Sequence, residues 1–143
     1  MRNLELSAAL PADAAEAWEV FIDTASWPSW GRLVVAAEGE FVPGHLWHME
    51  LRGDDGQSPR SMFPRFVSMI PGRQVVFETR IGGLWAVRMR HAFDIDPDGP
   101  DRSHLRQSFE VTGLFMAPLW PVLYRGMMQF EALGADLARR LAR

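Results

Sequence analysis

A run of strand-like segments joined by short turns, from Leu33 to Thr112, sets the fold class of this chain. The turn sequences FVPGH, GDDGQ, PGR, IGG and PDGPD are rich in Gly, Pro and Asp, and they separate about six strands. Strands joined by turns this short must pair antiparallel, because a parallel pair needs a crossover of a dozen or more residues. The run therefore predicts an antiparallel meander and excludes βαβ units.

The residues before this run predict a strand followed by a short helix. Asn3 to Ala9 alternates as a strand does, and PADAAEAWEVFID then changes to a helical period. Asp13 is placed to cap the helix, with Glu16 completing a capping box. SWPSW ends the unit in a tight turn or one further helical turn, and we expect Trp27, Pro28 and Trp30 to plug one end of the fold.

The C-terminal segment, from about Pro118 to Arg143, predicts one long helix. Pro118 and Pro121 are both assigned to its first turn, where a missing N–H costs no hydrogen bond. About 25 residues at 1.5 Å each give a length of roughly 37 Å, enough to lie across a sheet. Its apolar face comprises Leu123, Met127, Phe130, Gly134, Leu137 and Leu141.

The turns also predict how neighbouring strands pair. If PDGPD is a five-residue loop, Asp96 faces Arg102, and one face of the hairpin is charge-complementary while the other is mostly apolar. The predicted pairs in this hairpin include Arg88 with Glu110, Asp94 with His104, and His91 with Gln107. The PG turn predicts Arg65 opposite Glu78 and Phe66 opposite Phe77, and IGG predicts a three-residue loop with a bulge.

Composition narrows the function classes. The 143 residues fit a single domain, 1–143, and a hydrophobic share of 48% supports a packed core. There is no Cys for disulfides or thiolate metal sites, and all fifteen cations are Arg, which excludes Schiff-base chemistry on lysine. A net charge of −3 argues against nucleic acid, and the most apolar run, Leu114 to Tyr124, is too short to span a membrane. Without a signal sequence we expect a cytoplasmic protein.

In their order and spacing, PADAAEAWEVFIDTASWPSW, the PG before His45, PGRQVVFE, FDIDPDG and GLFMAPLWPVL resemble the SRPBCC superfamily of START-like lipid-transport and polyketide cyclase/dehydratase proteins. The resemblance covers nearly the whole chain. It implies an α+β helix-grip fold: a seven-stranded curved antiparallel sheet wrapped around a long C-terminal helix, with two short helices near the N-terminus. It also implies a cavity between sheet and helix for an apolar molecule. It implies no one reaction, because function on a shared fold belongs to the site.

His91 is the one candidate for a catalytic group. Its strand phase points it inward, and a buried imidazole opposite Gln107 could act as a general acid or base. The alternative is that His91 is a core histidine with a purely structural role, hydrogen-bonded to Gln107 across the hairpin. We favour this alternative, because buried polar groups usually find hydrogen-bond partners. No His or carboxylate spacing indicates a metal, and no P-loop or G-x-G-x-x-G indicates a nucleotide, so neither metal nor cofactor is expected.

The inward aromatic residues and methionines predict either a plain core or the lining of a ligand pocket. Because they are numerous for a small core, we expect a pocket. The predicted ligand-binding residues are Trp47, Met49, Phe66, Phe77, Trp85, Met89, His91, Gln107, Phe109, Leu123, Met127 and Phe130.

Three functions stay open at this point. A carrier or binding module for an apolar or amphipathic molecule (lipid, polyketide or aromatic/isoprenoid-like) leads, because few inward polar groups are visible. A polyketide-type cyclase or dehydratase is the alternative, and a protein-interaction module the weaker one. We expect a small-molecule ligand as partner, and a monomer or weak homodimer.

Overall fold

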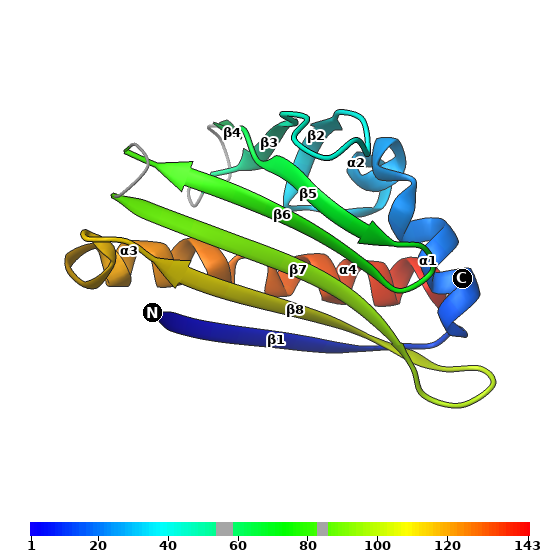
Figure 1. Cartoon of the computed structure of the whole chain (residues 1–143). Coiled ribbons are helices and arrows are strands. Elements are labelled where there is room, and N and C mark those ends of the chain that lie inside the picture. Colours follow the sequence, from blue (N-terminus) through cyan, green and yellow to red (C-terminus); the bar gives the residue numbers. More distant parts are fainter. Residues whose placement is uncertain (54–58, 83–85) are drawn as a thin grey trace.

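The structure is a computed structural model that describes residues 1–53, 59–82 and 86–143 (Figure 1). Within these ranges, helices and strands fall in separate runs, as expected for an α+β fold: one strand, the short N-terminal helices, seven strands in succession and two C-terminal helices. In chain order they are β1 (Arg2–Leu10), α1 (Ala14–Ile22), the 3₁₀ helix η1 (Thr24–Ser26), α2 (Trp27–Trp30), β2 (Val34–Glu38), β3 (His48–Arg52), β4 (Pro59–Met62), β5 (Arg65–Ile70), β6 (Gln74–Ile81), β7 (Val87–Pro97), β8 (Ser103–Thr112), α3 (Met116–Met128) and α4 (Glu131–Leu141).

The strands form a curved antiparallel sheet that covers one side of the C-terminal helices, as the helix-grip prediction requires (Figure 1). Five strands pair in the order β1-β8-β7-β6-β5, and three more in the order β2-β3-β4. A single antiparallel bridge between Leu46 and Arg65 links the two groups. Helices α1 and α2 lie at the end where α4 finishes, and α3 lies at the other end.

The described residues contain one strand more than the seven expected, and Pro64 is the reason. The segment between the GDDGQ and PGR turns was expected to be one strand, but it divides into β4 and β5. Proline has no N–H to donate and is poorly tolerated inside a paired strand. The chain changes partner at Pro64: β4, before it, pairs with β3, whereas β5, after it, pairs with β6.

Helix α1 begins at the cap that its sequence predicts. The Asp13 side chain caps α1 by accepting a hydrogen bond from the Glu16 N–H at 2.8 Å. Trp27 and Trp30 of α2 are both buried at this end of the fold, whereas Pro28, the third residue of the predicted plug, is exposed. The indole N–H of Trp27 donates to the carbonyl of Phe21 at 2.8 Å, so this large ring is buried with its polar atom satisfied.

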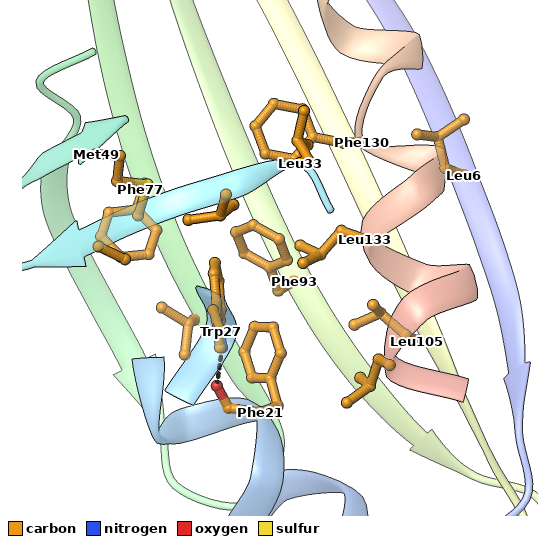
Figure 2. Close-up of a cluster of buried hydrophobic side chains, with 14 of the residues drawn as sticks. Leu6, Phe21, Trp27, Leu33, Met49, Phe77, Phe93, Leu105, Phe130 and Leu133 are labelled. Carbon is orange, nitrogen blue, oxygen red and sulfur yellow. Dashed lines mark hydrogen bonds between the residues drawn. The ribbon is translucent and has the colours of Figure 1, made fainter. Parts of the chain in front are cut away.

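The core follows the space between the sheet and the helices (Figure 2). Near α1, the rings of Phe21, Trp27 and Phe93 pack with centroids 5.2–6.2 Å apart. Leu105 of β8 and Leu133 of α4 are completely buried beside this cluster. The predicted apolar helix face is confirmed, because Leu123, Met127, Phe130, Gly134, Leu137 and Leu141 are all buried.

The register predicted for the β7–β8 hairpin is wrong by two residues. Arg88 faces Thr112, Arg90 faces Glu110 and Asp96 faces His104, so the loop begins one residue later than PDGPD suggests. A slip of two keeps every side chain on its predicted face, because strand side chains alternate with a period of two. Both registers place opposite charges across the outer face, so charge complementarity could not distinguish them.

The C-terminal helix differs from the prediction in two details. It runs as two successive segments, α3 and α4, interrupted at Gln129 and Phe130. It also begins at Met116, so Pro121 lies in its second turn and not in its first. The pyrrolidine nitrogen of Pro121 therefore leaves one carbonyl of the first turn without its helical partner.

The β5–β6 pair begins in the predicted register. Arg65 faces Glu78 and Phe66 faces Phe77, as expected from the PG turn. The predicted three-residue IGG loop falls partly on residues 83–85, outside the described part of the chain. Within the described ranges, no helix is long and apolar enough to cross a membrane, and no group of His, Asp and Glu could hold a metal ion.

Candidate functional site

A cavity of about 520 Å³ lies between α3 and the strands β3, β4, β6 and β7. Its lining residues on α3 place it toward that helix, and Figure 1 shows α3 at the end of the fold opposite α1 and α2. Its described lining residues are Leu51, Arg60, Ser61, Met62, Phe63, Thr79, Arg80, Ile81, Gly82, Met89, Val122, Leu123, Gly126, Met127 and Phe130.

The cavity exists partly because α3 presents a residue without a side chain to it. A Cβ added at Gly126 would meet no atom within 4 Å, so open space begins directly at the helix backbone. Leu123 and Met127, on the adjacent turns, are buried and form the apolar wall on the helix side. Thr79 and Met89 face each other across β6 and β7 and form part of the sheet side.

The lining is mostly apolar with a few polar groups. Aliphatic, methionine and phenylalanine side chains form most of it, and Arg60, Arg80, Ser61 and Thr79 are the polar members. The described lining contains no carboxylate and no histidine. A mostly apolar cavity with few polar groups is the usual form of a small-molecule site.

The structure places only part of the predicted ligand-binding set around this cavity. Met89, Leu123, Met127 and Phe130 line it. Trp85 lies outside the described residues. Seven others are buried but do not appear in the lining: Trp47, Met49, Phe66, Phe77, His91, Gln107 and Phe109.

Trp47, Phe66 and Phe77 do not line the cavity because an aromatic cluster fills the interior where they lie. The Trp47 ring packs against Phe41 at 4.8 Å and Phe77 at 5.3 Å, and its indole N–H donates to the carbonyl of Glu40. Phe66 completes the cluster at 5.8 Å from Phe77. Within the described residues, these side chains are therefore packed core, and the cavity lies at the α3 end of the fold.

His91 lies inside the core beside the cavity. Its ring stacks between Phe93 and Phe109, with centroids 4.0 Å away on each side, and meets the edge of Phe130 at 4.9 Å. Phe130 contributes to the cavity wall, whereas His91 does not. His91 Nε2 is 3.1 Å from Oε1 of Gln107, so the predicted pair is present. Because His91 faces Phe109, Gln107 is its diagonal neighbour and not its direct opposite.

These hydrogen bonds define the state of the imidazole. The Gln107 amide nitrogen donates to the carbonyl of Phe130 at 2.9 Å, which leaves its oxygen to accept from His91. The proton of the neutral ring is therefore on Nε2. Burial lowers the pKa of His91 to about 3, and the hydrogen bond with Gln107 opposes this shift only in part. At neutral pH the imidazole is uncharged and committed to a structural hydrogen bond.

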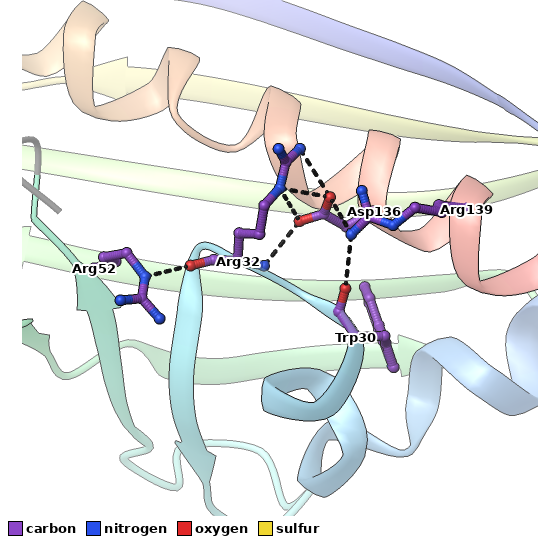
Figure 3. Close-up of polar contacts among 5 residues, drawn as sticks. All are labelled: Trp30, Arg32, Arg52, Asp136 and Arg139. Carbon is purple, nitrogen blue, oxygen red and sulfur yellow. Dashed lines mark hydrogen bonds and ion pairs between the residues drawn. The ribbon is translucent and has the colours of Figure 1, made fainter.

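Asp136 is a buried charge that the sequence interpretation missed (Figure 3). Its carboxylate accepts from the backbone N–H of Arg32 at 2.8 Å and pairs with the guanidinium groups of Arg32 and Arg139 at 2.9 and 3.0 Å. Arg139 also donates to the carbonyl of Trp30. The cluster joins α4 to the end of α2, away from the cavity lining, and so has a structural role. The sequence feature that indicates such a role is a single acidic residue, Asp136, on the apolar face of the helix.

A second hollow, of about 450 Å³, lies on the outer face of β1, β7 and β8. Its walls carry charged side chains, including Glu5, Arg90 and Glu110, over a floor that contains Ala92 and Ser108. This face points away from the helices toward solvent (Figure 1). Such a hollow cannot remove an apolar molecule from water as the inner cavity can.

Comparison with solved structures gives full-length matches to this fold. A START superfamily protein from Mycobacterium smegmatis is 16% identical, with a TM-score of 0.73 over 98% of this chain and 97% of that one. Norcoclaurine synthase from Thalictrum flavum, a point mutant with a transition-state analogue, is 14% identical, with a TM-score of 0.73 over 99% and 94%.

The di-domain ARO/CYC BexL from the BE-7585A biosynthetic pathway is 14% identical, with a TM-score of 0.74 over 97% of this chain and 46% of BexL. No protein-family model and no curated protein sequence matches the chain. At these identities the likeness establishes the fold and leaves the ligand open.

Proposed function

We propose that this chain, which has the helix-grip fold of the START-like (SRPBCC) superfamily, binds an apolar or amphipathic small molecule in the cavity beside α3. The observation that carries the proposal is the cavity itself: about 520 Å³, mostly apolar, between sheet and C-terminal helix. This volume falls within the range of small-molecule sites. One structural neighbour, norcoclaurine synthase, has been solved in complex with dopamine and hydroxybenzaldehyde, two small aromatic molecules.

A carrier or binding module fits this cavity better than a cyclase or dehydratase. Enolisation or dehydration needs a group that moves a proton within hydrogen-bonding reach of the substrate. The described lining offers no histidine and no carboxylate for that role. His91, the predicted candidate, is held against Gln107 and is not part of the cavity wall. Binding by burial of apolar surface requires no such group.

The proposal can be tested with the neutral fluorophore 1-N-phenylnaphthylamine, whose emission rises on transfer from water to an apolar site. The wild-type chain should bind it with saturation. Gly126→Leu should lose most of this affinity, because the new side chain would extend into the open space at Gly126. The variant should stay folded, since leucine favours a helix over glycine by roughly 1 kcal/mol.

Ala117→Leu is the matched control. Ala117 is exposed on the same helix and does not line the described part of the cavity, so introducing the same side chain there should leave binding unchanged. His91→Phe should also keep its affinity if His91 is structural. Wild-type protein that fails to bind the fluorophore, or Gly126→Leu protein that binds it equally well, would overturn the proposal.

A further inference from the structure

Arg60 is the charged group of the cavity that has no acidic partner among the described residues. It is directly opposite Leu51 in the β3–β4 pair, on the strand face that carries Met49 and Met62, and it is exposed where it lines the cavity. Arg80, the other arginine of the lining, is already paired with Glu78 at 3.0 Å. In the described part of the chain, no carboxylate forms an ion pair with Arg60.

A neutral contact holds the Arg60 side chain at the cavity. One terminal nitrogen of its guanidinium donates to Oε1 of Gln129 at 3.1 Å, where α3 ends. The side chain thus crosses from β4 to the helix beside the apolar wall. A guanidinium has five N–H donors in a planar fork, so one bond to an amide leaves donors for a second acceptor.

We propose that the ligand of this cavity is an amphipathic organic acid, whose carboxylate pairs with Arg60 while its apolar body occupies the space beside Gly126 and Met127. This inference rests on the proposed function and adds the class of ligand. The charge of the site supports it, because the described lining contains cations and no anion. A planar carboxylate also matches the fork of a guanidinium, which can bind it through two parallel hydrogen bonds.

The test compares dodecanoate with dodecan-1-ol, two probes of equal chain length, by displacement of 1-N-phenylnaphthylamine at pH 8. Arg60→Gln should weaken dodecanoate about tenfold or more, because it removes a charge-assisted hydrogen bond. The affinity for dodecan-1-ol should change less than about twofold by the same reasoning. Arg60→Lys, which keeps the charge, should recover part of the loss for the acid only.

Arg102→Gln is the matched control. It removes the same charge from an exposed position in the β7–β8 loop, at the other end of the molecule from α3, and should leave both affinities unchanged. If Arg60→Gln weakens both probes equally, or neither, the inference is wrong and the binding function stands. If wild-type protein binds neither probe nor the fluorophore, the proposed function itself fails.

Discussion

His91 couples the folded state to pH through a single side chain. Its ring lies between Phe93 and Phe109, and burial lowers its pKa to about 3, whereas an unfolded chain would restore a pKa near 6.5. Between these values the unfolded state binds a proton that the folded state does not. The free energy of unfolding therefore increases with pH across this window and decreases as pH falls through it.

His91 should make the stability of the folded protein depend on pH. From pH 7.5 to pH 5, His91 should reduce the free energy of unfolding by roughly 2 kcal/mol, at about 1.4 kcal/mol per pH unit below 6.5. His91→Phe keeps an aromatic ring in the stack but cannot be protonated. It should therefore lose about 2 kcal/mol less than the wild type over the same interval, as measured by urea denaturation at each pH.

The comparison of slopes separates this effect from a general loss of stability. His91→Phe leaves Oε1 of Gln107 without its partner and should cost about 1–3 kcal/mol at every pH. Such a constant offset does not alter the slope. His45→Gln, at an exposed position, is the control and should keep the wild-type slope. Equal slopes for wild type and His91→Phe would contradict the assignment of a buried neutral imidazole.

Strand phase was enough to predict that His91 and Gln107 point inward, whereas the register that set them directly opposite was wrong, and they meet as diagonal neighbours. Strand phase could not place them relative to the cavity, because that depends on how far the aromatic side chains of other segments fill the interior. Trp47 lies in solid core since Phe41, on a loop with no strand pattern, packs against its ring. Arg60 was not predicted to line the cavity for a similar reason, because its position there depends on the pairing of β4 with β3.

The two halves of the C-terminal helix pack differently, and two glycines show the difference. Gly134 of α4 approaches β1 so closely that an added Cβ would lie 2.8 Å from Cβ of Ala8. Gly126 of α3 faces open space. Both positions belong to a continuous helical pattern in sequence, so the close approach and the cavity could not be distinguished without the tertiary structure. The apolar periodicity of the sequence also could not predict the interruption at Gln129 and Phe130, between α3 and α4.

The same substitution should therefore have opposite effects at these glycines. Gly126→Ala should raise the free energy of unfolding by up to about 1 kcal/mol, because alanine is the better helix former and its methyl group meets nothing. Gly134→Ala gains the same propensity but must push α4 away from β1. It should lower stability by about 1–3 kcal/mol, as overpacked cores do. Urea denaturation of the two variants measures both values, and a stabilised Gly134→Ala protein would show that α4 can shift freely.

Over the whole molecule, packing is asymmetric from one end to the other. The end formed by α1, α2 and α4 is solid, with the aromatic cluster around Trp27 and the Asp136 ion pairs (Figures 2 and 3). The α3 end contains the cavity and leaves large apolar side chains exposed, among them Val122 at 68% and Phe63 at 55%. The antiparallel meander and the long helix over it were predictable from turn spacing and apolar periodicity. The unequal filling of its two ends was not.

This asymmetry predicts where the folded protein opens first. Local opening is easiest where few buried apolar contacts hold an element, and backbone amides there exchange with solvent sooner. The amides of α3 from Leu123 to Met128 should therefore exchange faster than those of α4 from Leu133 to Leu137, which lie against β1 and the core. Native-state hydrogen exchange followed by mass spectrometry can measure the two segments separately.

A ligand in the cavity should remove much of this difference, because binding to the closed state stabilises it by an amount that grows with ligand concentration. Saturating 1-N-phenylnaphthylamine should slow exchange in α3 and leave α4 nearly unchanged. Gly126→Leu, which fills the same space from the helix itself, should slow α3 without any ligand and make it insensitive to the fluorophore. If α3 and α4 exchange at the same rate in the free wild-type protein, the cavity does not weaken its end of the fold. If the fluorophore slows both helices equally, it acts on global unfolding and not on the α3 end.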